Sequence, residues 1–136
     1  MTEVYDEAAM RHYRDGELLR REDRVANADQ LYGLAAECAI KSALVCLTGS
    51  ASDGQLVTQY KEHIDRLWDI APVQGLQKRY PRLAAVLKAL RPFDDWSIRQ
   101  RYEGDDAVGP DALEHHRRAA SRILGSLQLH GAREEG

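Results

Sequence analysis

One segment, residues 27–47, constrains the fold of this chain more than any other part of the sequence. Its sequence is NADQLYGLAAECAIKSALVCL, and apolar residues occupy nearly every side of the helix that it predicts. A helix of this kind is usually buried among other helices. Glu37 and Lys41 lie one turn apart on it, although such a pair is typical of a solvent-exposed face. The segment therefore predicts a central helix with a narrow polar stripe that faces a partner, a cleft or a seam.

The polar stripe follows helical neighbours along this segment, with apolar residues on both flanks. Its members are Gln30, Gly33, Glu37, Lys41 and Thr48, broken only by Leu44. The simplest interpretation of Glu37 and Lys41 is an intrahelical salt bridge whose lysine reaches to water. The functional alternative is a stripe that contacts a partner subunit or lines a pocket.

Helical periodicity dominates the rest of the chain, and no stretch alternates apolar and polar residues long enough to predict a strand. We expect an all-α fold, an up-and-down bundle of four to five helices, in one domain spanning residues 1–136 with a frayed tail at 129–136. Helices are predicted over residues 2–21, 27–47, 56–70, 83–90 and 110–129. The inner edge predicted for the first helix consists of Val4, Ala8, His12 or Tyr13, Leu18 and Leu19.

The segment 91–111 is the longest irregular connection, and we expect one helical turn at about residues 96–102. It mixes aromatic, acidic and glycine residues without a clean period. Because binding residues are concentrated in long loops held by a rigid scaffold, this segment is the most promising functional loop.

Composition and charge limit the class of protein. With 43% hydrophobic and 30% charged residues, the chain falls in the soluble globular range, and no apolar run approaches the ~18 residues of a membrane helix. The charged start, MTEVYDEAAMRHYRDGE, is neither a signal peptide nor an anchor, which favours a cytoplasmic location without membrane contact. The net charge of −3 argues against nucleic-acid binding over the whole surface but permits local basic patches.

No motif for metal, cofactor or nucleophilic chemistry is found. His115 and His116 are adjacent and so point about 100° apart on a helix, unlike an i, i+4 chelating pair. Gly49 and Gly54 have the spacing of a phosphate loop, but the required Lys and Ser or Thr do not follow them. We therefore predict no catalytic residue, no metal site and no cofactor from the residues alone.

The string DGELLRREDRVANADQLYGLAAECAIKSAL, residues 15–44, resembles the opening helix pair of the HEPN superfamily, the nucleotide-binding domains of higher eukaryotes and prokaryotes. In that family an Asp-Ala and Leu-Leu helix is followed by a turn and a helix with an Ala-Ala-Glu-x-x-x-Lys core. The matching residues are Asp15, Leu18, Leu19, Ala35, Ala36, Glu37 and Lys41, with Gly16 in place of the usual alanine. Further matches are His63 with Leu67, and the pair Arg101 and Tyr102 before the last helix.

The resemblance implies one of two branches of the superfamily. Ribonuclease members carry an arginine followed, after four to six residues, by a histidine near the start of the last helix, paired across a dimer. None of the five histidines here has an arginine at that spacing, and seven residues separate Arg122 from His130. Because metal-free RNA cleavage needs a general acid or base beside a cation, the chain is more similar to the branch without this motif. Members of that branch dimerise or accompany minimal nucleotidyltransferases.

We therefore expect a non-catalytic HEPN-like homodimer that binds a nucleotide, RNA or a protein partner, such as a separately encoded nucleotidyltransferase. The predicted dimer also rests on the apolar surface of the central helix, which a small bundle covers with difficulty. The predicted ligand-binding residues are Lys41, Arg99, Arg101 and Tyr102, and the predicted structural or interface polar residues are Glu37 and His63.

Three alternatives stay open. The first is that the chain is a divergent metal-independent endoribonuclease or toxin of a toxin–antitoxin or defence system, in which Arg99 and Arg101 act with His63 or His115. The second is that it is a purely structural adaptor. The third concerns the segment 91–111: Arg101 pairs with a core acid such as Glu37 and only holds this segment to the bundle.

Overall fold

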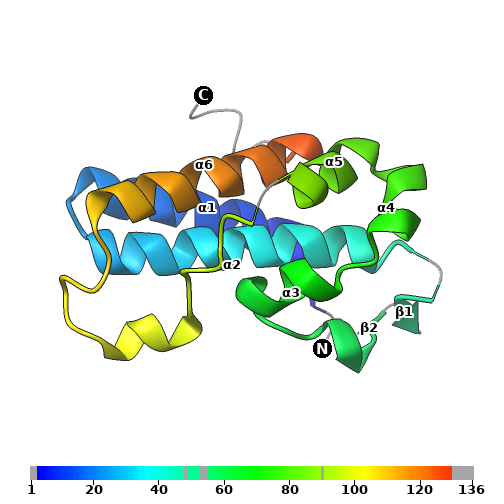
Figure 1. The fold of residues 1–136 in the computed structure, drawn as a ribbon, viewed down its shortest axis with the longest axis horizontal. Coiled ribbons are helices and arrows are strands. Elements are labelled where there is room, and N and C mark those ends of the chain that lie inside the picture. The colour runs from blue at the N-terminus through cyan, green and yellow to red at the C-terminus, as the bar shows by residue number, and fades with distance from the viewer. Residues whose placement is uncertain (1–2, 48, 53–54, 90, 130–136) are drawn as a thin grey trace.

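The computed structural model describes residues 3–47, 49–52, 55–89 and 91–129. These residues form an all-α fold, which confirms the predicted all-α class (Figure 1). They contain six α-helices, more than the four to five predicted. The helices are α1 (Tyr5–Arg21), α2 (Val25–Leu44), α3 (Ile64–Ile70), α4 (Val73–Arg79), α5 (Pro81–Ala89) and α6 (Pro110–Ser126). Two 3-10 helices, η1 (Thr58–Tyr60) and η2 (Ile98–Tyr102), and a hairpin of β1 (Ala51–Ser52) with β2 (Gln55–Leu56) complete the described elements.

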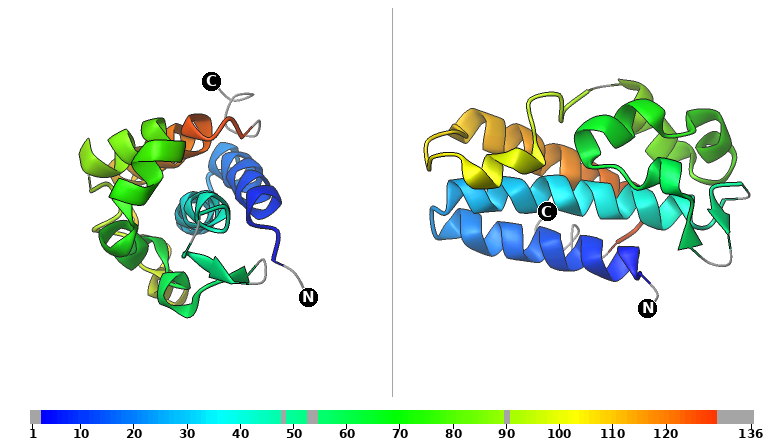
Figure 2. Two further views of the ribbon diagram at one scale, coloured as in Figure 1. Left: turned by 90° about the vertical axis from the view of Figure 1, so that its right-hand side faces the viewer. Right: turned by 90° about the horizontal axis from the view of Figure 1, so that it is seen from below.

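Helix α2 is the centre of the molecule. Viewed end-on in Figure 2 (left), it is surrounded by the other helices, and it packs against α1, α6, α3 and η2. Fourteen of its twenty residues are buried, many more than in any other described helix, as its apolar flanks predict. Five of these buried residues are alanines, and small side chains at a contact allow helices to pack at short interaxial distances. None of the described helices has the length and apolar composition needed to cross a membrane.

The predicted inner edge of α1 is wrong in part. Leu18 is 52% exposed and Val4 is 49% exposed, whereas Tyr13, Gly16 and Glu17 are buried. The burial of Tyr13 agrees with the prediction, which otherwise followed the aliphatic residues. The observed face is rotated because a carboxylate, Glu17, occupies an inner position next to the small Gly16.

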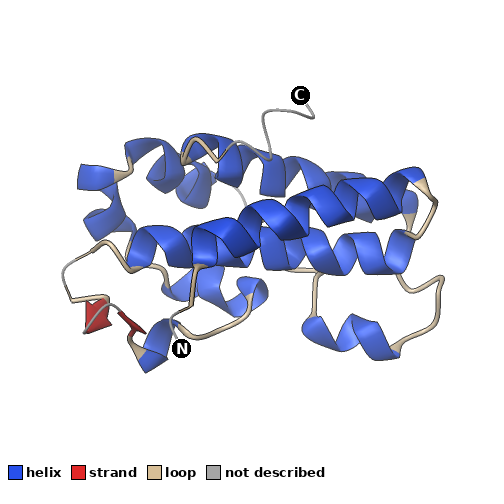
Figure 3. Ribbon diagram, turned by 180° about the vertical axis from the view of Figure 1, so that it is seen from behind, coloured by secondary structure: helices blue, strands red, loops and turns tan. Residues whose placement is uncertain are grey.

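The predicted third helix, residues 56–70, is also wrong over its first half. Strand β2, in antiparallel register with β1, ends at Leu56, and η1 and an extended residue, His63, precede α3 (Figure 3). The expectation that no strand forms is therefore wrong for this two-residue hairpin. The apolar spacing was nevertheless informative, because Tyr60, Ile64 and Leu67 are buried although only the last two lie on an α-helix.

Prolines set the boundaries of the C-terminal helices. Pro81 is the first residue of α5 and separates it from α4, which the sequence analysis did not predict. Pro110 is the first residue of α6, as predicted, since a missing N–H is tolerated in the first turn of a helix. Helix α6 ends three residues earlier than predicted, and residues 130–136 of the predicted tail lie outside the described residues.

Candidate functional site

The polar stripe of α2 is covered by segments of the same chain. Gln30, Gly33, Glu37 and Lys41 are all buried. In Figure 1, η2 and α3 lie along one side of α2, and both pack against it. The polar stripe was predicted to face a partner, a cleft or a seam. In the structure it faces a seam, because other segments of the same chain pack against it. Thr48, the last predicted member, lies outside the described residues.

Trp96 fixes the predicted functional loop to α2. In the structure this loop covers residues 91–109, because α6 begins at Pro110. Its indole is 2% exposed, and the indole N–H donates to the backbone oxygen of Asp29 at 2.9 Å. A Cβ atom at Gly33 would lie 2.0 Å from Trp96 Cε2, so only glycine leaves room for the ring. Gln30 adds a second tie, because its Nε2 donates to the backbone oxygen of Ser97 at 2.7 Å. The loop is therefore held against a rigid helix just before η2 begins.

The 3-10 helix η2 is capped at its start and exposes three side chains. Ser97 Oγ accepts from the backbone N–H of Arg99, and the Gln100 side chain accepts from the backbone N–H of Ser97, which together form a capping box. Arg99 and Arg101 are exposed, and Tyr102 is 78% exposed. The Arg101 guanidinium lies 4.8 Å from the centroid of the Tyr102 ring, within the range of a cation–π contact. These three exposed side chains are named the η2 platform.

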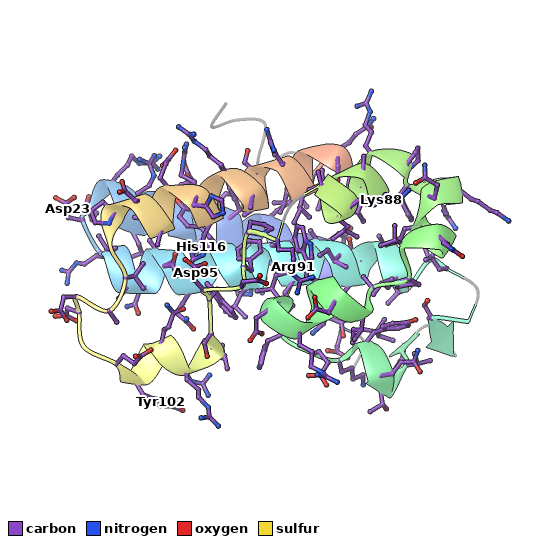
Figure 4. All side chains as sticks on the ribbon, in the orientation of Figure 1. Asp23, Lys88, Arg91, Asp95, Tyr102 and His116 are labelled. Atoms are coloured by element: carbon purple, nitrogen blue, oxygen red, sulfur yellow. The ribbon has the colours of Figure 1, made fainter. Side chains whose placement is uncertain are left out.

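The four predicted ligand-binding residues do not form one site. The η2 platform contains three of them, and Figure 4 shows Tyr102 at its outer end. Lys41 is buried and lies eleven residues after Gln30, about 16 Å along the helix axis at a rise of 1.5 Å per residue. Among the described residues, Arg101 has no ion pair with Glu37, so the predicted core pairing of this arginine is not observed.

Glu37 is the centre of a buried polar cluster that includes both predicted structural residues. Its Oε2 accepts from Lys41 Nζ at 3.0 Å, and its Oε1 lies 3.0 Å from His63 Nδ1. The side chains of Lys41 and Glu37 are only 10% and 7% exposed, so the lysine does not reach to water as the simplest interpretation assumed. The His63 side chain is 50% exposed. A buried carboxylate therefore orients an imidazole that solvent can reach.

A histidine with no exposed surface joins α6 to α2 and to the functional loop. His116 Nδ1 lies 2.6 Å from Asp29 Oδ1, and His116 Nε2 lies 2.6 Å from Asp95 Oδ1 (Figure 4). Each ring nitrogen faces a carboxylate, and this geometry favours the imidazolium form, in which both nitrogens donate. Burial alone would lower the pKa of His116, but the hydrogen bonds and charges of the two aspartates raise it above its usual value.

Glu17 forms a further buried cluster that ties α1 to α2 and α6. Tyr32 Oη donates to its Oε1 at 2.6 Å, and Arg117 donates to both carboxylate oxygens, with Nε at 2.6 Å from Oε1. Burial alone would raise the pKa of Glu17, but the hydrogen bonds from Arg117 and Tyr32 and the nearby positive charges lower it to about 2. Arg117 is thus a structural residue and is not available to an external ligand.

Sequence reasoning missed Glu17, Asp29 and His116 as buried polar residues. A signal for His116 was present, because it lies three residues after Leu113 and four before Ala120 on the apolar stripe of the last helix. A polar side chain at such a position needs a buried partner. The partners themselves were not predictable, since Asp29 lies 87 positions away in the chain and Asp95 lies 21 positions away.

No model of a known protein family matches this chain, and comparison with curated proteins and with solved structures likewise gives no match. Within the part of the chain that the structure describes, no group of three or more His, Cys, Asp or Glu side chains is arranged to hold a metal ion. The η2 platform and the polar clusters behind it are therefore the features of the described residues that indicate a function.

Proposed function

We propose that this chain is a non-catalytic, HEPN-like helical domain that binds a nucleotide or a short single-stranded RNA through the η2 platform. One observation carries the proposal. Two arginines and a tyrosine are exposed on a capped turn that Trp96 and Gln30 hold rigidly against the central helix.

The chemistry of the η2 platform suits a phosphate joined to a base. A guanidinium can donate two parallel hydrogen bonds to a phosphate, and neither Arg99 nor Arg101 forms an ion pair among the described residues. The Tyr102 ring has Arg101 near it and most of its surface exposed, so it can stack on a base. Because the backbone of the turn is fixed before binding, little conformational entropy is lost when the ligand binds.

Three acidic residues limit the size of the proposed ligand. Glu103, Asp105 and Asp106 directly follow the η2 platform in the chain, and all are exposed. They repel a phosphate backbone that continues in that direction. We therefore propose a ligand of one or a few nucleotides, not a long nucleic acid.

The HEPN assignment and the homodimer are part of this proposal. The assignment is supported by the residues of α1 and α2 that match the family pattern, together with the all-α fold. The apolar surface that motivated the dimer prediction is covered by the chain's own α1, α3, α6 and η2. The homodimer, like a nucleotidyltransferase partner, therefore rests on the resemblance alone.

Equilibrium binding tests the proposal. ATP and a labelled single-stranded RNA of about six nucleotides are titrated against wild type, Arg101→Ala, Tyr102→Ala and the control Arg14→Ala, an exposed arginine on α1. Loss of stacking in Tyr102→Ala should weaken binding at least about fivefold, because stacking on an aromatic ring contributes about 1 to 3 kcal/mol per base. Melting temperatures should not change, since these side chains are exposed. Absence of wild-type binding, or equal weakening in Arg14→Ala, contradicts the proposal.

A second candidate, a metal-independent ribonuclease, is favoured by the geometry of His63. The carboxylate of Glu37 orients its Nδ1, which leaves Nε2 available to accept a proton from a ribose 2′-hydroxyl. Incubation of RNA with wild type, His63→Ala, His115→Ala and the exposed control Arg14→Ala distinguishes the candidates. Cleavage by wild type and by Arg14→Ala that is absent in His63→Ala or His115→Ala would replace the non-catalytic assignment.

A further inference from the structure

Positive charge is concentrated at one end of the molecule. Residues 71–93 contain five Lys or Arg and no Asp or Glu, and residues 115–126 contain three Arg and no Asp or Glu, although the whole chain has a net charge of −3. The fold brings these two segments together, because α5 packs against α6 (Figures 1 and 2). The surface formed by α5 and the C-terminal half of α6 therefore contains basic residues, and neither of these two segments contributes an acidic residue to it.

A shallow groove of about 390 Å³ lies between these two helices. An arginine from each helix lines it, and the other lining residues, here called its floor, are small or aliphatic. The arginines are Arg82 and Arg122, and the floor residues are Ala85, Val86, Ala89, Gly125 and Ser126. We name this feature the α5–α6 groove.

The two arginines of the α5–α6 groove are exposed and have no hydrogen-bond or ion-pair partner among the described residues. Most basic residues around them are already engaged by the chain itself. Those with partners are Arg79, Lys88, Arg91, Arg117 and Arg118. The unpaired guanidinium groups are therefore available to an anionic partner, and the floor between them offers apolar surface.

We propose that the α5–α6 groove is the docking surface for an acidic amphipathic helix of a partner protein. A helix lying in a groove buries an apolar stripe, and the small Ala85, Ala89 and Gly125 let its backbone come close. Asp or Glu residues beside that stripe pair with Arg82 and Arg122. This surface is separate from the η2 platform, so the inference does not depend on the proposed nucleotide binding.

Two other occupants fit the groove less well. A nucleic acid would place phosphates on the arginines, but the groove offers no aromatic side chain for base stacking and would bury its apolar floor against sugar and phosphate. A second copy of this chain, docked through the same groove about a twofold axis, would bring the same arginines together. Like charges at such an interface oppose association.

An NMR titration of the isotope-labelled full chain tests the inference. The probe is a synthetic peptide of about 14 residues with leucines at i, i+3, i+4 and i+7 and glutamates on both sides of that stripe. A scrambled peptide of the same composition and a peptide with lysine in place of glutamate serve as controls. We expect the amide signals of residues 82–89 and 122–126 to shift with the acidic amphipathic peptide and not with either control.

Three variants locate the binding. Arg82→Glu combined with Arg122→Glu reverses the charge of the groove, and Ala85→Trp fills it without a charge change. Both should weaken peptide binding by about tenfold or more, as removal of central contacts does at other interfaces. Lys78→Glu is the matched control, because this exposed lysine on α4 lies outside the residues that line the groove, and it should change binding less than about twofold. Melting curves confirm that each variant is folded.

Several results would overturn the inference. They are the absence of any peptide-induced shift at millimolar concentration, equal binding of the scrambled peptide, and equal weakening in Lys78→Glu. A single-stranded RNA that shifts the groove amides and loses this effect in the charge-reversed variant would assign the groove to nucleic acid. Sedimentation that shows a dimer disrupted by Ala85→Trp would assign it to a second copy.

Discussion

Replacing Gly33 by alanine changes the stability of the protein through two opposing effects, helix propensity and a steric clash with Trp96. Glycine in a helix interior is less favourable than alanine by about 0.5 to 1 kcal/mol, so helix propensity alone predicts that Gly33→Ala stabilises the protein. The structure predicts the opposite sign. The new Cβ would lie 2.0 Å from Trp96 Cε2 and 2.3 Å from Trp96 Nε1, distances that require the indole to move.

The expected magnitude follows from what the indole loses when it moves. Trp96 is 2% exposed, and complete removal of a buried tryptophan side chain costs about 3 to 5 kcal/mol. Displacement forfeits part of this packing and also the hydrogen bond from its N–H to Asp29, which contributes about 1 kcal/mol. After the gain in helix propensity is subtracted, we expect Gly33→Ala to lower the free energy of unfolding by about 2 to 4 kcal/mol.

Urea denaturation followed by circular dichroism measures this change, and the chain offers a matched control. Gly125 also lies in a helix, but a Cβ there meets nothing within 4 Å, so Gly125→Ala should stabilise by up to about 1 kcal/mol. A double-mutant cycle with Trp96→Ala isolates the clash, because Gly33→Ala should be neutral or stabilising once the indole is absent. If Gly33→Ala stabilises the wild type as much as Gly125→Ala does, the placement of the functional loop against α2 is wrong.

Further predictions concern the buried polar clusters and the core. The pKa of Glu17 is lowered to about 2, so it contributes stability above the unfolded value of 4.5 that is lost as pH falls towards 2. Glu17→Gln should remove this acid dependence and cost about 3 kcal/mol at neutral pH, as measured by denaturation across pH. The pKa of His116 is raised, so its contribution is present below pH ~6.5 and is lost as pH rises through the folded pKa. His116→Gln should reduce the loss of unfolding free energy as pH rises through this range. An unchanged dependence of stability on pH would contradict the imidazolium assignment. Ile40→Ala should cost about 2 to 5 kcal/mol, whereas Leu18→Ala should change stability by less than about 0.5 kcal/mol; equal costs would mean that the face of α1 is misassigned.

The long helices were predictable because each carries its signal locally. The apolar flanks of residues 27–47 identified the buried helix, and Pro110 marked the start of the last helix. Local sequence patterns did not predict the position of a side chain where contacts with distant residues determine it. Glu17 faces inward only because Arg117 and Tyr32, distant in sequence, satisfy its carboxylate.

The candidate site was predictable in part. The irregular segment before the last helix drew attention to Arg99, Arg101 and Tyr102, and the structure places all three together on an exposed turn. The failure concerns Lys41, which a sequence pattern cannot distinguish from an exposed lysine. Its burial results from α2 being covered by other segments of the chain, a property of the whole fold.

Mapping where a nucleotide lies on the folded protein tests the proposed η2 site itself. A short single-stranded RNA containing 4-thiouridine is cross-linked to the full chain by near-ultraviolet light, and the modified residue is identified by mass spectrometry. We expect the cross-link to fall on Tyr102 or its neighbours in η2, and an excess of RNA without 4-thiouridine to suppress it. Cross-links at His63 or along α5 and α6, or none above the level of an unfolded control, would contradict the proposed η2 site.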